Sequence, residues 1–112
     1  MSKLHDPSVV ENLKSLIGED KFSVILSSSR ASLESIIAEL KTAYTSSDHE
    51  TMRRAAHSIK SSVGNYGALP VSQKAEELEH KYKDNDLSNA ASEIEELEGM
   101  VQTVLSELDE YM

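Results

Sequence analysis

The feature that most restricts the fold of this chain is the spacing of its apolar residues, which recur at steps of three and four. This period places apolar side chains along one stripe of an α-helix. From about Asp20 to Ser46 the stripe contains Phe22, Leu26, Ser29, Leu33, Ile36, Leu40 and Tyr44. No segment alternates apolar and polar residues in the way that is typical of a half-buried β-strand. The sequence therefore predicts an all-α fold.

A short helix is predicted before this long one. Asp6 followed by Pro7 is typical of an N-cap and the first helical position, where the missing N–H of proline has no cost. Gly18 favours the end of the helix. The apolar residues between these signals are Val9, Val10, Leu13, Leu16 and Ile17.

Three more helices are predicted after the polar break at Ser46–Asp48. Ser47 and Glu50 have the spacing of a capping box for a helix that extends from about Asp48 to Tyr66. Gly64 and Gly67 favour a turn, and Pro70 is tolerated near the start of the next helix. The apolar stripes of the last two helices are Val71, Ala75, Leu78 and Tyr82, then Ala91, Ile94, Leu97, Val101, Val104 or Leu105, and Leu108.

Short connections between long helices favour antiparallel neighbours. We therefore expect one domain over residues 1–112, folded as an up-down antiparallel four-helix bundle with a short additional N-terminal helix.

Composition excludes several classes of function. The formal net charge of -9 argues against nucleic acid or an anionic membrane as the main ligand, because both need a basic surface. No apolar run approaches the ~20 residues of a membrane span, and the N-terminus lacks the form of a signal peptide. The chain has no cysteine, which excludes disulfides, a thiol nucleophile and zinc–thiolate sites. A soluble cytoplasmic protein is the simplest interpretation.

His57 is the candidate functional residue. On a helical projection with Ile59 at zero, the predicted core residues fall within roughly 60° of Ile59, whereas His57 falls near 160°. These core residues are Met52, Ala55, Ala56, Ser62, Val63 and Tyr66. His57 is therefore expected in the middle of the polar face, and a buried structural role is disfavoured. An ordinary surface histidine stays possible on the projection alone.

The neighbours of His57 favour a reactive role over that alternative. Arg53, Lys60, Ser61 and Gly64 share its polar face, at roughly 100–200° on the projection. Lys60 follows one turn later and is a compact cation able to bind a phosphoryl group on the imidazole. Ser61 and Gly64 are small, so a partner could approach closely. A neutral imidazole has a lone pair for nucleophilic attack.

The segments His57-Ser-Ile-Lys60-Ser-Ser62, Gly67-Ala68 and Leu78-Glu79 resemble the signature of histidine-containing phosphotransfer (HPt) domains. That pattern is His-x-Leu-Lys-Gly, then Gly-Ala, then Leu-Glu, and the similarity covers residues 53–79. The chain departs from it at Ser61, where glycine is commoner. A serine there could bind the phosphoryl group or crowd the partner.

The resemblance implies a relay. His57 would be phosphorylated, Lys60 would stabilise the phosphoryl charge, and Gly67 would set the helix corner. The partners would be the receiver domains of a hybrid sensor kinase and of a response regulator. The chain would need no cofactor of its own, with Mg²⁺ expected in the receiver. No glycine-rich nucleotide loop occurs, so ATP-dependent kinase activity is not expected.

The docking surface would lie around His57 and take in Arg53, Ser61, Gly64 and Gly67. Leu13 and Ile17 are candidates for an apolar part of that surface, although core burial is the more natural role for both.

Other interpretations are weaker. A non-catalytic helical adaptor explains the stripes but not the surroundings of His57. A metal-binding bundle would use Glu77-x-x-His80, but no second such motif occurs. His5 and His49 are interpreted as incidental. Met1 favours a stand-alone protein over a domain excised from a larger kinase, and we expect a monomer. The sequence does not identify the partners or the direction of phosphate flow.

Overall fold

The computed structural model describes residues 3–112, so Met1 lies outside the described residues. They form five α-helices and no strand, which confirms the all-α prediction. The helices are α1 (Pro7–Ile17), α2 (Glu19–Thr45), α3 (His49–Gly64), α4 (Leu69–Lys83) and α5 (Ala90–Asp109). Within the described residues, no helix is both long and apolar enough to cross a membrane.

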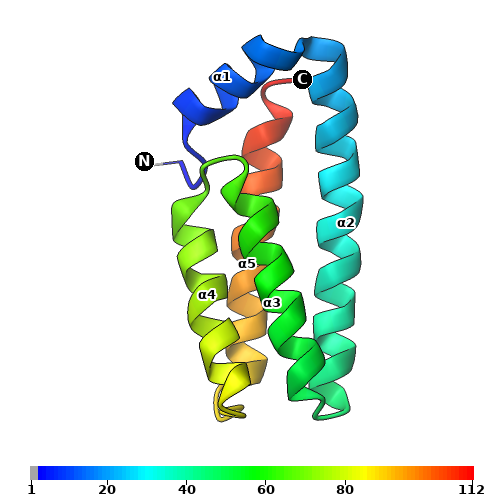
Figure 1. The fold of residues 1–112 in the computed structure, drawn as a ribbon, viewed down its shortest axis with the longest axis vertical. Coiled ribbons are helices and arrows are strands. Elements are labelled where there is room, and N and C mark those ends of the chain that lie inside the picture. Colours follow the sequence, from blue (N-terminus) through cyan, green and yellow to red (C-terminus); the bar gives the residue numbers. More distant parts are fainter. Residues whose placement is uncertain (1–2) are drawn as a thin grey trace.

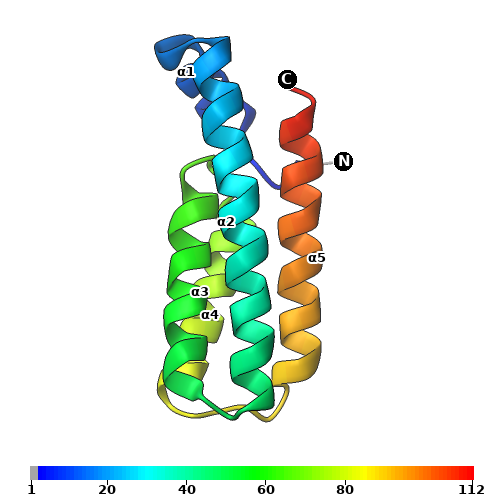
Figure 2. The same ribbon diagram turned by 90° about the vertical axis from the view of Figure 1, so that its right-hand side faces the viewer.

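Four of the helices lie side by side, and α1 crosses one end of them (Figure 1). The α2–α3 and α4–α5 connections lie at the opposite end from α1, the α3–α4 connection and the C-terminus. α3 packs against α2 and α4, and α5 contacts both α2 and α4. Figure 2 shows α5 on the other side of α2 from α3. The four helices therefore enclose a shared core.

The core is filled by large side chains from all four long helices. The largest fully buried ones are Tyr66, Tyr82, Phe22, Leu26, Leu33, Leu40, Met52, Ile59, Leu78, Leu97, Leu105 and Leu108. Most predicted stripe residues are among the buried set, including all four of α4. This agreement follows from the helical period, because burial on one face is what the period encodes.

Some stripe residues were assigned wrongly. In α2 the structure also buries Ile37 and Ala43, whereas Ile36 is only partly buried against the core and Tyr44 is exposed. The buried stripe of α2 is broad because this helix contacts α1, α3 and α5. In α5, Ala90 is buried instead of Ala91. In α1 the structure leaves Leu16 84% exposed.

The N-cap predicted for α1 is confirmed, whereas the N-cap predicted for α3 is wrong. Asp6 caps α1 as predicted, since its side chain accepts the Ser8 N–H at 3.0 Å. The predicted Ser47–Glu50 capping box is wrong. Asp48 caps α3 instead, and its carboxylate accepts the Thr51 N–H at 3.2 Å. An aspartate at this position offers a charged acceptor to the helix N-terminus, which a serine does not.

His5 is not incidental. It lies in the segment before α1 and its side chain is buried. Its Nδ1 lies 2.6 Å from Oε1 of Glu107, and its Nε2 lies 2.8 Å from the Tyr111 hydroxyl. Glu107 also accepts the N–H groups of Leu4 and His5, at 3.0 and 3.1 Å. Burial alone would raise the pKa of the Glu107 carboxyl, but these hydrogen bonds together hold it below its usual value. We call His5, Glu107 and Tyr111 the His5 cluster.

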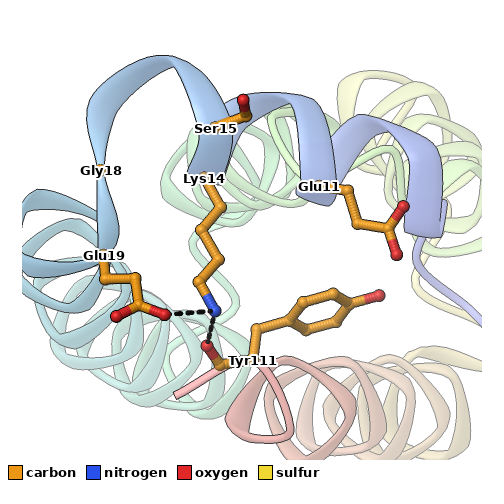
Figure 3. A pocket seen from close by; sticks show the side chains of 6 residues that line it. All are labelled: Glu11, Lys14, Ser15, Gly18, Glu19 and Tyr111. Carbon is orange, nitrogen blue, oxygen red and sulfur yellow. Dashed lines mark hydrogen bonds and ion pairs between the residues drawn. The ribbon is translucent and has the colours of Figure 1, made fainter.

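α1 is fastened to the C-terminal end of the chain by a second contact. Lys14 Nζ donates to the Tyr111 carbonyl at 2.6 Å and lies 3.6 Å from the Glu19 carboxylate, as Figure 3 shows. Together with the His5 cluster, this contact holds the N-terminal segment and α1 against the end of α5. The charge of Lys14 in this pocket is therefore already used to hold the fold together.

Candidate functional site

The structure places His57 on the outer side of α3, with 56% of its side chain exposed. The opposite side of α3 is buried and consists of Met52, Ala55, Ala56, Ile59 and Val63. Ser62, which the projection placed with the core, is only partly buried. The helical period thus positions the imidazole at the surface in the middle of a well-packed helix.

One carboxylate connects the two residues that the sequence singled out. Glu79 of α4 lies 3.0 Å from His57 Nδ1 through Oε2 and 3.2 Å from Lys60 Nζ through Oε1. Only 16% of the Glu79 side chain is exposed. We call these three residues the His57 cluster. It is assembled by the packing of α3 against α4.

Glu79 determines which ring nitrogen of a neutral His57 carries the hydrogen. Burial alone would raise the pKa of its carboxyl, but hydrogen bonds from Lys60 and His57, with their charges, hold it below its usual value. An ionised carboxylate only accepts hydrogen bonds, so the hydrogen of a neutral ring is assigned to Nδ1. The lone pair is then on Nε2, which has no hydrogen-bond partner among residues 3–112.

Sequence reasoning missed the role of Glu79. The residue was quoted as part of the Leu78-Glu79 motif, but no function was assigned to it. The available signal was its place next to the buried Leu78 at the edge of the α4 stripe. Its partners lie on the preceding helix, and His57 is 22 residues away along the chain, so only the packing of the two helices brings them together.

Cationic and small residues surround the cluster. A shallow hollow beside His57 is lined by Arg53, Arg54, His57, Ser58 and Glu79. The Arg53 guanidinium is held by Glu50, with Nη2 at 2.6 Å from Oε1. Ser61, also on α3, is exposed. A Cβ at Gly64 would meet nothing nearer than Ser72 Oγ at 4.0 Å. The fold itself therefore does not require glycine at position 64.

Gly67 is different because the fold does require it. Its φ of +69° is unfavourable for other residues, and an added Cβ would lie 2.6 Å from Cβ of Asp6 and 3.0 Å from Cγ2 of Val9. The Asp6 N–H also donates to the Tyr66 carbonyl at 3.2 Å. Gly67 thus lies at the corner between α3 and α4, where the start of α1 packs on it.

The remaining histidines have other surroundings. His49, also interpreted as incidental, has Nδ1 3.0 Å from the Tyr82 carbonyl and links the start of α3 to the end of α4. His80 is largely exposed, 3.9 Å from Glu76, while Glu77 lies near lysines. Over residues 3–112, the structure contains no group of three or more His, Cys, Asp or Glu side chains placed to hold a metal ion.

Comparisons with known proteins agree with this geometry. The Hpt domain family model matches residues 24–107, a range that contains the whole His57 cluster. A solved structure, histidine-containing phosphotransfer protein B (HptB) from Pseudomonas aeruginosa PAO1, is similar with a TM-score of 0.88 and 25% sequence identity. The match covers 99% of this chain and 96% of that chain. No curated protein matches the sequence significantly.

Proposed function

The chain belongs to the Hpt domain family, and from this premise we propose that it carries phosphoryl groups in a phosphorelay. His57 accepts the group from an aspartyl phosphate of one receiver domain and passes it to an aspartate of another. The observation that carries the proposal is the His57 cluster, where Nδ1 is held by Glu79 and Nε2 is open to a partner.

The transfer step follows from the ring geometry. Nε2 of the neutral imidazole attacks phosphorus in line, an N–P bond forms, and the P–O bond to the receiver aspartate breaks with release of its carboxylate. No general base is needed because the attacking nitrogen carries no proton. Positive charge that develops on the ring is offset by Glu79, which keeps the hydrogen bond from Nδ1. In the return step a receiver carboxylate attacks phosphorus and the N–P bond breaks.

Lys60 supports the phosphorylated state. Its ammonium is one helical turn from His57 and 3.2 Å from Glu79, so a small side-chain movement brings it to the new phosphoryl oxygens. Mg²⁺ bound by the receiver would neutralise charge on the group in transfer, and this chain would contribute no cofactor of its own.

The docking surface proposed for the receiver surrounds His57. Arg53 lines the hollow beside His57, Ser61 and Gly64 are exposed on the same helix, and Gly67 would support the surface by setting the corner. Leu13 and Ile17 are packed partly against the core. More exposed apolar side chains at the α1 end of the bundle are Leu16, Val24, Ile25 and Leu69, and we propose these as the apolar part of the surface. We propose that a monomer presents this surface.

We also assign α2 to α5 the up-down antiparallel bundle topology. The assignment is supported by the short connections between these helices and by the alternating ends at which the connections lie. α1 is the additional N-terminal helix.

Labelling tests the proposal. Incubation with a phosphorylated receiver domain is expected to label the protein with an alkali-stable, acid-labile phosphoryl group. His57→Gln should abolish the label, and the matched variant His80→Gln should keep it, because His80 is another exposed histidine. An acid-stable label, or a labelled His57→Gln protein, would contradict the assignment. A wild type that accepts no label would favour the adaptor role instead.

A further inference from the structure

Charge is distributed very unevenly between the helices. α3 carries Arg53, Arg54 and Lys60 against the single carboxylate of Glu50, a formal net charge of +2 in a chain of net charge -9. α5 has the opposite character, with no lysine or arginine. Its six carboxylates are Glu93, Glu95, Glu96, Glu98, Glu107 and Asp109. The helix that bears His57 is thus a cationic strip on an anionic protein.

Arg54 differs from the other two cations of α3. Arg53 is paired with Glu50 at 2.6 Å, and Lys60 is paired with Glu79 at 3.2 Å. Within residues 3–112, Arg54 has no carboxylate within ion-pair distance, and its one side-chain contact is with Thr51 Oγ1 at 3.4 Å. Arg54 is exposed, and its charge acts on Asp48 and Glu50 only from beyond ion-pair distance, so its guanidinium donors stay available to another molecule.

The position of Arg54 suits a partner of His57. The two residues are one helical turn apart, about 4.5 Å along the axis, and both line the hollow beside the cluster. An arginine presents a fork of N–H donors that matches a carboxylate. A surface that delivers an aspartyl phosphate and holds Mg²⁺ must carry carboxylates, since these are the oxygen ligands that Mg²⁺ prefers.

We propose that Arg54 is the docking residue that pairs with an acidic group on the rim of the receiver's phosphorylation site, and that it orients this rim onto His57. The inference rests on the proposed function. The acidic α5 face repels the same rim, so the charge asymmetry favours approach to α3. An exposed charge of this kind acts mainly on association rate and on its salt dependence.

Transfer kinetics test the inference. The second-order rate constant for transfer from a phosphorylated receiver, and the rate at saturating receiver, are measured at low and high salt. At ~50 mM salt, Arg54→Gln should lower the second-order constant about three- to tenfold, and ~500 mM salt should remove most of the difference. The rate at saturation should not change. Arg54→Lys should recover most of the loss, because the charge is kept.

Lys41→Gln is the matched control. It removes the same charge from an exposed residue of α2 that faces α5, on the other side of α2 from α3 and the hollow. Equal effects of Arg54→Gln and Lys41→Gln at every salt concentration would overturn the inference and leave the labelling of His57 intact. A salt-independent loss in the rate at saturation would also overturn it, because Arg54 would then act on the transfer step. Failure of the wild type to accept phosphate would instead remove the proposed function.

Discussion

Two histidines in residues 3–112 place Nδ1 against a glutamate, and their surroundings differ in a way that separates structure from chemistry. His57 lies 3.0 Å from Glu79, and over half of its side chain is exposed. His5 lies 2.6 Å from Glu107, and 1% of its side chain is exposed. The glutamate contact is common to both, so it does not identify the reactive residue.

The difference lies in the second ring nitrogen. Nε2 of His5 is 2.8 Å from the Tyr111 hydroxyl, so both nitrogens of that ring are used to hold the N-terminal segment on α5. Nε2 of His57 has no hydrogen-bond partner among residues 3–112, and more than half of the side chain is exposed, so this nitrogen is available to another molecule. A ring with both nitrogens satisfied and no access to solvent stabilises the fold, whereas a ring held at one nitrogen is oriented for attack by the other.

Removing each imidazole in turn should produce the largest difference between the two histidines. His5→Ala should lower the free energy of unfolding by about 2–4 kcal/mol, because it leaves Glu107 and Tyr111 without partners and opens a cavity. His57→Ala should change it by less than about 0.5 kcal/mol, as is usual for an exposed side chain. Urea denaturation measures both.

Phosphoryl acceptance should show the reverse order. At a temperature where it is folded, the His5→Ala protein is expected to accept the label, and the folded His57→Ala protein is not. The comparison fails if His5→Ala is as stable as the wild type, or if its folded form accepts no phosphate.

Two glycines allow a similar comparison for the backbone. Gly67 is crowded by the segment that follows His5, whereas Gly64 lies on the helix that bears His57 and has open space around it. Gly67→Ala should destabilise the protein by about 2–3 kcal/mol, because the residue has a positive φ and the new Cβ would press on Asp6 and Val9. Gly64→Ala should be neutral or stabilising by about 0.5 kcal/mol, since it has room and alanine favours a helix. Thermal unfolding of the two variants measures the contrast. Equal melting temperatures would show that the corner does not constrain Gly67.

The smallest effect concerns Glu79. In Glu79→Gln the amide oxygen still accepts the Nδ1 hydrogen, but the charge opposite the ring is lost, so transfer should slow about three- to tenfold. In Glu79→Ala the orientation is lost as well. Nitrogen NMR of the His57 ring should show the Nδ1–H tautomer kept in the first variant and mixed with the other tautomer in the second. A role in stability alone would leave the tautomer unchanged in both.

The sequence was sufficient to predict features that depend on local periodicity. The exposure of His57, the burial of the α4 stripe and the Asp6 cap each depend on neighbours within a turn or two. It was not sufficient to predict side-chain contacts between segments that are distant in the sequence. The partners of His5 lie about a hundred residues away, and Glu79 approaches His57 only through the packing of α3 and α4. A period shows which face is buried but not which polar groups meet across helices.

The predictions for the N-cap of α3 and for the buried stripe of α2 were inaccurate for a different reason. Ser47 and Asp48 are both good N-caps, and the choice between them depends on the turn, in which Ser47 has a φ of +56°. Likewise Ile36 and Ile37 are equally apolar, and the packing of α2 against its neighbours buries Ile37 almost completely and Ile36 only in part.

The most direct test of the account is the position of the phosphoryl group on the ring. Phosphorus and nitrogen NMR of the protein labelled by a phosphorylated receiver distinguishes attachment at Nε2 from attachment at Nδ1. We expect a single phosphohistidine, at Nε2 of His57, with Nδ1 still hydrogen-bonded to Glu79. Attachment at Nδ1, or at any other histidine, would contradict it.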